Sequence, residues 1–217
     1  MQVPIVGWGG GPWGSGGWGV GTATLFGIRL WSQSNFGEDL VFAYRGGPLL
    51  YWDATGTTST RGVYVSSLTG ASDVPTIVNY TIVSDINRFA FAFGCNEIGS
   101  ADIDPMLVRW SDQEDVAMWT PAATNQAGSL RLSHGSEIVS ALQARQEVLV
   151  WTDTSLYSLQ YLGAPEVWGA QILGDNLSIA SPNAMAYAAN TAFWMGKDKF
   201  YLYDGTVRPL PSDLRRY

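Results

Sequence analysis

Few residues of this 217-residue chain could act as acid–base or nucleophilic groups. His134, in Ser-His-Gly, is the only histidine and would be the natural base for a catalytic serine. Such a pair also needs an orienting third group, and the chain has no Gly-x-Ser-x-Gly elbow. We therefore interpret His134 as a turn residue and predict no catalytic residue.

Carboxylates offer a second chemistry, because glycosidases use an Asp/Glu pair and oxygen ligands hold hard cations. Asp102 and Asp104, in Ala-Asp-Ile-Asp-Pro, are one candidate pair. They lack the repeated acidic positions and closing glutamate of a calcium loop, so we interpret them as a loop that Pro105 ends. The second candidate, Glu114-Asp115, is expected in the hairpin after an apolar strand.

Cofactor signals are weak as well. Gly14-x-Gly16-x-x-Gly19 matches the dinucleotide fingerprint, but that motif needs a strand before it and a helix after it, and neither is expected here. Cys95 is the only cysteine and is interpreted as a small buried residue. One cysteine and one histidine leave no His/Cys metal site, so we predict no metal and no cofactor.

The elements that must position these groups follow a repeat. Four apolar stretches end in Trp52, Trp110, Trp151 and Trp194, separated by 58, 41 and 43 residues. Self-similarity at about 40–50 residues is typical of β-propeller blades. The tryptophans are interpreted as core anchors that mark the blades, with stacking on sugars as the alternative. The aspartates that follow three of them are expected to cap turns at equivalent repeat positions: Asp53, Asp112 and Asp153.

Strands and turns alternate from residue 25 onward. The predicted strands are 25–32, 39–44, 48–52, 77–83, 88–93, 138–142, 148–151, 155–161, 184–188, 191–195, 200–203 and 207–210. Asp204-Gly205 predicts a type I′ turn with both residues at positive φ, and 137–146 allows a helix as the lesser option. The predicted fold is all-β: a propeller-like array of about four antiparallel blades over 25–217, which can belong to a larger propeller, after a Gly/Trp-rich linker over 1–24.

Charge and hydropathy argue against several classes of function and favour association with other chains. The net charge of −7 argues against phosphate contacts as the main activity, because nucleic-acid affinity depends on clustered Lys and Arg. Charged residues are only 14% of the chain, which favours association with copies or partners. No basic n-region precedes an apolar run, and no stretch approaches about 20 apolar residues, so neither a secretory signal nor membrane insertion is expected.

Several runs resemble the tail nozzle (tail tubular protein B-like) proteins of short-tailed bacteriophages. They include Leu-Trp-Ser-Gln-Ser-Asn-Phe-Gly-Glu-Asp-Leu at 30–40, Val-Arg-Trp-Ser-Asp-Gln-Glu-Asp at 108–115 and Val-Trp-Thr-Asp-Thr-Ser-Leu-Tyr at 150–157. Shorter runs lie at 45–47, 51–53, 119–121, 193–196 and 200–205. The resemblance covers most of 7–210. Family members are longer, so the attachment and tip regions of a complete nozzle are expected to be missing here.

The resemblance implies a structural, non-enzymatic virion protein of the phage tail, synthesised in the host cytoplasm. It implies a homo-oligomeric ring of six copies below the portal and adaptor, through which DNA passes without specific binding. An acidic chain suits such a conduit, because it repels phosphates. The alternatives are a carbohydrate-binding or glycan-cleaving propeller for host attachment, and a scaffold propeller of prophage origin with a new partner.

Overall fold

The structure is a computed structural model that describes residues 2–5, 24–27 and 29–211. By its contacts the chain divides into two compact units, residues 1–30 and residues 31–217. The sequence-based border at residues 24/25 therefore falls within the first unit.

The first unit contains a two-stranded antiparallel sheet. β1 (Gln2–Ile5) pairs with β2 (Thr24–Gly27), so that Gln2 lies opposite Gly27. The predicted Gly/Trp-rich linker run at 7–21, with its Gly14-x-Gly16-x-x-Gly19 fingerprint, lies outside the described residues.

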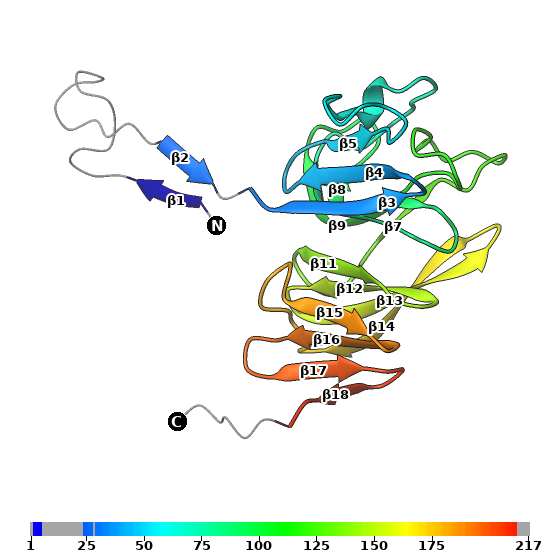
Figure 1. Ribbon diagram of the computed structural model, residues 1–217. Helices are drawn as coiled ribbons and strands as arrows, with labels where there is room; N and C mark the ends of the chain where they lie inside the picture. The colour runs from blue at the N-terminus through cyan, green and yellow to red at the C-terminus, as the bar shows by residue number, and fades with distance from the viewer. Residues whose placement is uncertain (1, 6–23, 28, 212–217) are drawn as a thin grey trace, which may run out of the picture. The chain divides into compact units, whose positions relative to one another are not determined.

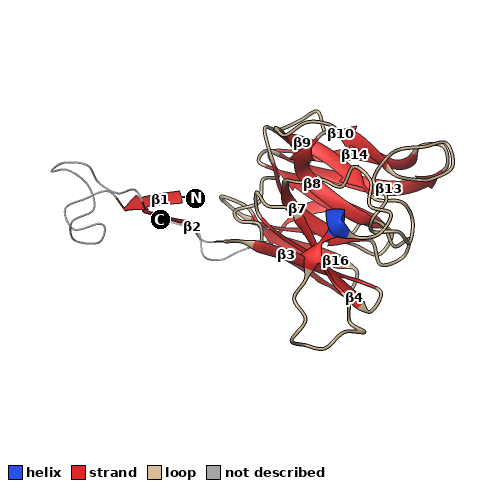
Figure 2. Ribbon diagram, turned by 90° about the horizontal axis from the view of Figure 1, so that it is seen from above, coloured by secondary structure: helices blue, strands red, loops and turns tan. Residues whose placement is uncertain are grey.

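The second unit is a propeller-like array of four four-stranded antiparallel sheets, which confirms the predicted fold class (Figure 1). Each sheet is a meander of consecutive strands, here called blades 1 to 4. Blade 1 holds β3 (Trp31–Phe36), β4 (Asp39–Tyr44), β5 (Leu49–Trp52) and β6 (Val63–Tyr64); blade 2 holds β7 (Val78–Val83), β8 (Ala90–Asn96), β9 (Ile103–Trp110) and β10 (Gly128–Arg131); blade 3 holds β11 (Ile138–Gln143), β12 (Glu147–Thr152), β13 (Ser155–Gly163) and β14 (Val167–Asp175); blade 4 holds β15 (Met185–Ala188), β16 (Thr191–Met195), β17 (Phe200–Tyr203) and β18 (Val207–Pro209). A single 3-10 turn, η1 (Val65–Ser67), is the only helical element in the described part of the chain (Figure 2).

Most predicted strands are present, with borders that differ by a few residues. One of the strand predictions is wrong. The strand expected over 25–32 is divided between β2 and β3, which belong to different units. Within 137–146 the preferred strand is confirmed as β11, and the helix that was the lesser option does not form. The patterning also missed β1, β6, β10 and β14, and the last three are outermost strands of their blades.

In blade 4, a type I′ turn forms at a different hairpin from the one predicted. Ala189 and Asn190 both have positive φ, 49° and 61°, as a type I′ hairpin turn requires. In Asp204-Gly205 only the glycine has positive φ, at 106°. The prediction of a type I′ turn at Asp204-Gly205 is therefore wrong, although the hairpin itself forms between β17 and β18.

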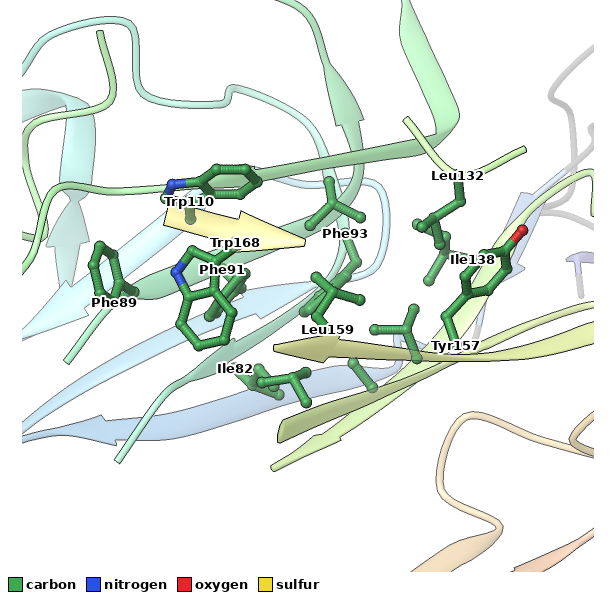
Figure 3. Close-up of a cluster of buried hydrophobic side chains, with 14 of the residues drawn as sticks. Ile82, Phe89, Phe91, Phe93, Trp110, Leu132, Ile138, Tyr157, Leu159 and Trp168 are labelled. Carbon is green, nitrogen blue, oxygen red and sulfur yellow. The ribbon is translucent and has the colours of Figure 1, made fainter. Parts of the chain in front are cut away.

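The core lies between the blades rather than within any one of them. One hydrophobic cluster joins blades 1 and 2, a second joins blades 2 and 3, and a third joins blades 3 and 4. Figure 3 shows the second cluster, in which Phe91 and Trp110 of blade 2 lie near Leu159 and Trp168 of blade 3. β7 lies beside β3 and β4 on one side and beside β11 on the other. Each blade is thus stabilised by burying a face against its neighbour, as the repeat predicts.

The four tryptophans do not occupy equivalent positions. Trp52 and Trp110 end the third strands of their blades, whereas Trp151 and Trp194 lie in the second strands of theirs. Trp110, Trp151 and Trp194 are buried, but Trp52 is only partly buried. The spacing of 58, 41 and 43 residues therefore mixes two strand positions, and the prediction that Asp53, Asp112 and Asp153 follow equivalent strands is wrong.

No helix in the described residues is long and apolar enough to cross a membrane.

Candidate functional site

A small pocket lies where turns from three blades meet. It has a volume of about 300 Å³ and takes its walls from the turns that join the first and second strands of blades 2, 3 and 4. The lining residues are Asp85, Ile86, Gln143, Ala144, Arg145, Tyr187 and Asn190. The loop between first and second strands occupies the same end of every blade, so this end of the array gathers polar side chains from separate repeats.

One hydrogen bond joins two walls of the pocket, and another lies within the wall from blade 3. The Arg145 backbone N–H donates to the Tyr187 hydroxyl at 3.1 Å, which ties blade 3 to blade 4. The Gln143 amide nitrogen donates to the Ala144 carbonyl at 2.6 Å. Gln143 Oε1 is buried and accepts no hydrogen bond from any described residue. An unpaired buried acceptor is costly unless a ligand or water bonds to it.

The chemistry available in the pocket is that of binding. A carboxylate, a guanidinium, two amides and a phenol are suited to a small ligand rich in hydroxyl or amide groups. Asp85 is the only carboxylate among the lining residues, whereas glycoside hydrolysis needs two facing each other across the bond. The pocket therefore does not supply the acid–base pair of a glycosidase.

His134 lies at the other end of blade 3, in the loop before β11. Its ring is more than half exposed, and its Nδ1 lies 3.5 Å from Asp175 Oδ1. Ser155 donates its hydroxyl proton to Asp175 at 2.7 Å rather than to the imidazole. Within residues 29–211, no hydroxyl makes a hydrogen bond with the His134 ring. The imidazole therefore lacks the contact by which a base activates a serine or threonine nucleophile.

Asp104 belongs to a strand and not to the predicted loop. β9 begins at Ile103, so Pro105 does not end the loop but lies inside the strand. Pro105 has no N–H, and pairing of β8 with β9 skips it through a register shift between Phe93 and Cys95. Gly94, at φ +57°, occupies that shift, and a Cβ there would approach the Pro105 carbonyl.

The carboxylate of Asp104 is held by an arginine rather than by a metal. Arg131 Nε donates to it at 2.6 Å, and the Met106 N–H donates at 3.0 Å. Burial opposes ionisation, but these hydrogen bonds and the Arg131 charge outweigh it and lower the pKa of Asp104. Over the described ranges, no group of three or more His, Cys, Asp or Glu side chains is placed to hold a metal ion.

The carboxylates Asp102 and Glu114 lie beyond opposite ends of β9. Asp102 precedes the strand by one residue and Glu114 follows it by four, and the strand has eight residues. Such a strand spans roughly 26 Å, far more than the roughly 5–9.5 Å that separates glycosidase carboxylates. Asp115, next to Glu114, accepts the Ala117 N–H at 2.8 Å and so stabilises the predicted hairpin after Trp110.

The aspartates that follow the tryptophan-containing strands accept hydrogen bonds from turn groups, which is the predicted capping role. Asp53 accepts from the Thr55 N–H at 2.8 Å, and Asp112 from the Gln126 N–H at 2.8 Å. Asp153 accepts from the Ser136 N–H at 2.7 Å and from the Ser136 hydroxyl at 2.6 Å. Burial acts against ionisation of Asp153, but the bonds from Ser136 and nearby N–H groups outweigh it and lower its pKa.

Arg109 is a buried cation that the sequence patterning did not single out. Its guanidinium donates to the Asn96 carbonyl at 3.2 Å and to the Asp73 carbonyl, and it lies over the Trp119 ring at 6.0 Å. Burial lowers the pKa of Arg109. The sequence signal that could have identified it is a charged residue within the apolar run at 107–110. Arginine is rarely fully buried without partners, so such a position predicts a buried, hydrogen-bonded guanidinium.

The two terminal blades each present an apolar face to solvent. Residues opposite one another in a strand pair share a face, so the register defines both surfaces. We call the apolar side chains on the outward surface of blade 1 the first-blade face: Trp31, Leu40, Phe42, Leu50, Trp52 and Tyr64; Gln33, Asn35 and Tyr44 share that surface. We call the apolar side chains on the outward surface of blade 4 the fourth-blade face: Ala186, Phe193, Met195, Phe200 and Leu202; Thr191 and Arg208 share that surface. Trp31 is 48% exposed and Phe200 is 50% exposed, whereas the inward residues Val41 and Trp194 are buried.

Comparisons with known proteins give structural likeness only. No family model and no curated protein matches the sequence. Kluyvelomyces marxianus Hsv2 is similar at 5% identity and a TM-score of 0.43, over 79% of this chain and 46% of that chain. Apo AztD from Citrobacter koseri is similar at 14% identity and a TM-score of 0.47, over 88% of this chain and 48% of that chain. The chain spans about half the length of each.

Proposed function

We propose that this chain is a structural, nozzle-like protein of a short-tailed bacteriophage tail, forming part of the oligomeric tube for genome ejection below the portal and adaptor. The observation that carries the proposal is the pair of apolar blade faces at the two ends of the array. Contiguous exposed apolar surface marks interaction sites, and it suits a protein whose work is assembly.

The runs that resemble nozzle proteins also support a role in tail assembly. Run 30–40 covers β3, the following turn and the start of β4, and run 200–205 covers β17 and the turn after it. Both runs therefore contribute to terminal blades. The net charge of −7 agrees with a conduit that DNA passes without binding. By resemblance the ring contains six copies and resides in the virion.

The test is genetic and structural. Disrupting the gene in the phage that carries it is expected to give capsids with portal and adaptor but without nozzle density in electron micrographs, and to abolish infectivity. Mass spectrometry of purified wild-type virions is expected to detect the chain. Infectious virions that lack the chain would refute the proposal. Portal, adaptor and terminase genes beside the coding sequence would separate a tail role from that of a prophage-derived scaffold.

A second candidate, carbohydrate binding for host attachment, is favoured by the pocket at the turns of blades 2 to 4. Its amide, guanidinium and phenol groups match the hydroxyl groups of a sugar. Glycan-array binding that weakens at least tenfold in Arg145→Ala, and not in the control Arg61→Ala on an exposed loop, is the expected result. No glycan binding by the wild-type chain would exclude this role.

A further inference from the structure

The inward and outward faces of the blades follow one rule along the whole array. Each blade has one face on the side of the preceding blade and one face on the side of the following blade. In every internal contact, the second kind of face of one blade packs on the first kind of face of the next blade. Three such contacts occur, one in each hydrophobic cluster. Each internal contact therefore joins one face of each kind, and none joins two faces of the same kind.

The terminal faces are the two unmatched members of this series. The fourth-blade face is of the kind that packs on a following blade, and the first-blade face is of the kind that packs on a preceding one. Both carry large apolar side chains at the alternate positions that the internal contacts use: Phe193, Met195 and Phe200 on one, and Trp31, Phe42 and Leu50 on the other. Repeat arrays expose such faces only at a cost, and they normally cap or pair them.

We infer that the fourth-blade face of one copy of this chain packs on the first-blade face of a second copy, so that blade-to-blade packing continues across the contact. The occupant is a second copy because this chain itself makes both halves of the matching pair. The contact is heterologous, since two different surfaces meet. A face-to-same-face contact would instead join surfaces that no internal interface joins.

The surfaces also have the chemistry of an interface. Trp31 makes an edge-to-face contact with Tyr44 at 5.5 Å and lies 6.0 Å from Phe42, so the aromatic rings form one patch. Met195, which is 42% exposed, pairs with Phe200 on the facing strand of blade 4. Tryptophan, phenylalanine and methionine are enriched at interface centres, where rigid or adaptable apolar side chains fill the partner surface.

Two single variants test the contact, Trp31→Glu and Phe200→Glu. Each places a charge at an exposed apolar position of one face, and Ile98→Glu is the matched control, since Ile98 is an exposed apolar residue in the β8–β9 turn of blade 2. Molar mass is measured by light scattering at high micromolar concentration, with circular dichroism to verify folding. The wild-type chain and the control are expected to associate, and each face variant alone is expected to be monomeric.

Mixing the two variants is the decisive step. Their mixture retains one intact contact, between the fourth-blade face of Trp31→Glu and the first-blade face of Phe200→Glu. It is therefore expected to form a one-to-one complex that neither variant forms alone. A monomeric wild-type chain overturns the inference. So does a pattern in which one variant still associates and the mixture gains nothing, because that is the signature of a face-to-same-face contact.

The contact and the tail role are both argued from the apolar blade faces, but the two proposals can fail separately. A chain that associates head to tail but is missing from virions would uphold the contact and refute the nozzle. A chain that is present in virions but stays monomeric when isolated would uphold the nozzle and refute the contact.

Discussion

At the scale of single residues, the polar groups of this chain act mainly on its own backbone. The aspartates at the blade ends accept turn N–H groups, and Arg109 donates to the carbonyl of Asn96 at the end of β8 and to that of Asp73 in the loop before β7. Such groups stabilise loops that have little apolar surface to bury, because they replace the hydrogen bonds that water would otherwise provide.

Asp153 gives the clearest test of this role. Asp153→Ala removes acceptors for the Ser136 N–H and hydroxyl, so it is expected to lower the free energy of unfolding by about 1–3 kcal/mol at neutral pH. The pKa of Asp153 lies below its ordinary value of 3.8, so its stabilisation is complete above that value and is lost as the pH falls through the folded-state pKa. Urea denaturation of both proteins from pH 7 to pH 3 should show the difference shrinking below about pH 4.

The control for this series is Asp198→Ala, in an exposed turn of blade 4. It is expected to change the stability by no more than about 0.5 kcal/mol. An Asp153→Ala penalty that is the same at pH 3 and pH 7 would contradict the capping role.

Cys95 is expected to be unreactive in the folded protein. Burial raises the pKa of its thiol to about 12; the Arg109 charge lowers it to a smaller extent, and the Asp104 charge raises it further. The thiolate is the reactive form, so iodoacetamide at pH 8 should modify Cys95 only as fast as the chain opens. Alkylation measured by mass spectrometry should be complete at once in urea and slow without it. Equal rates in both would show that the side chain is accessible.

At the scale of elements, blades 3 and 4 are joined by a pair of indole rings. Trp151 and Trp194 lie in the second strands of their blades and meet edge to face at 5.5 Å. The Nε1 of each is buried and has no hydrogen-bond partner within the described residues. Their contribution therefore comes from apolar area and ring geometry, less the cost of two unpaired donors.

A double-mutant cycle measures that pairing. Trp151→Leu and Trp194→Leu are each expected to lower the free energy of unfolding by about 2–3 kcal/mol, less than truncation to alanine because a smaller cavity remains. The double variant should cost less than the sum of the two by about 0.5–1.5 kcal/mol, since the ring contact is lost only once. Trp52→Leu, on the first-blade face, is the control and should cost about 1 kcal/mol or less. Strict additivity would contradict the pairing.

The same tryptophans show how far the sequence predicts the elements. Alternating apolar residues and glycine-containing turns located most strands, because a half-buried sheet and its hairpins impose local rules. They could not show which strand of a blade each tryptophan occupies, since that depends on how many strands precede it in its sheet. β10 was missed because Gly128 to Arg131 is short and only partly buried, so its pairing with β9 is set by the fold and not by its own pattern.

The site was less predictable than the strands. The pocket residues come from turns more than 100 residues apart, from Asp85 to Asn190, and no local motif connects them. The terminal faces could be found only after the register had assigned each side chain to one surface. The low fraction of charged residues, 14%, was the one sign in the sequence that the molecule has apolar surface for partners.

At the scale of the whole molecule, stability is shared unevenly along the array. Blades 2 and 3 are covered on both faces, and all seven residues of β8 are buried. Blade 4 is covered on one face, and its outer strands are largely exposed or partly buried. In a repeat array each unit is stabilised by its neighbours, so the terminal blades should open most readily.

Hydrogen exchange followed by mass spectrometry tests this gradient and the contact between copies together. Amides of β8 and β12 are expected to exchange slowest, and those of β17 and β18 fastest, at low protein concentration. As concentration rises, head-to-tail packing should slow exchange in the strands of the two terminal faces, β3, β4, β16 and β17, because association stabilises only what it covers. Phe200→Glu should remove the concentration dependence in both blades at once, although only blade 4 carries the substitution. Slowing that persists in blade 1 of this variant would mean that something other than the fourth-blade face covers the first-blade face.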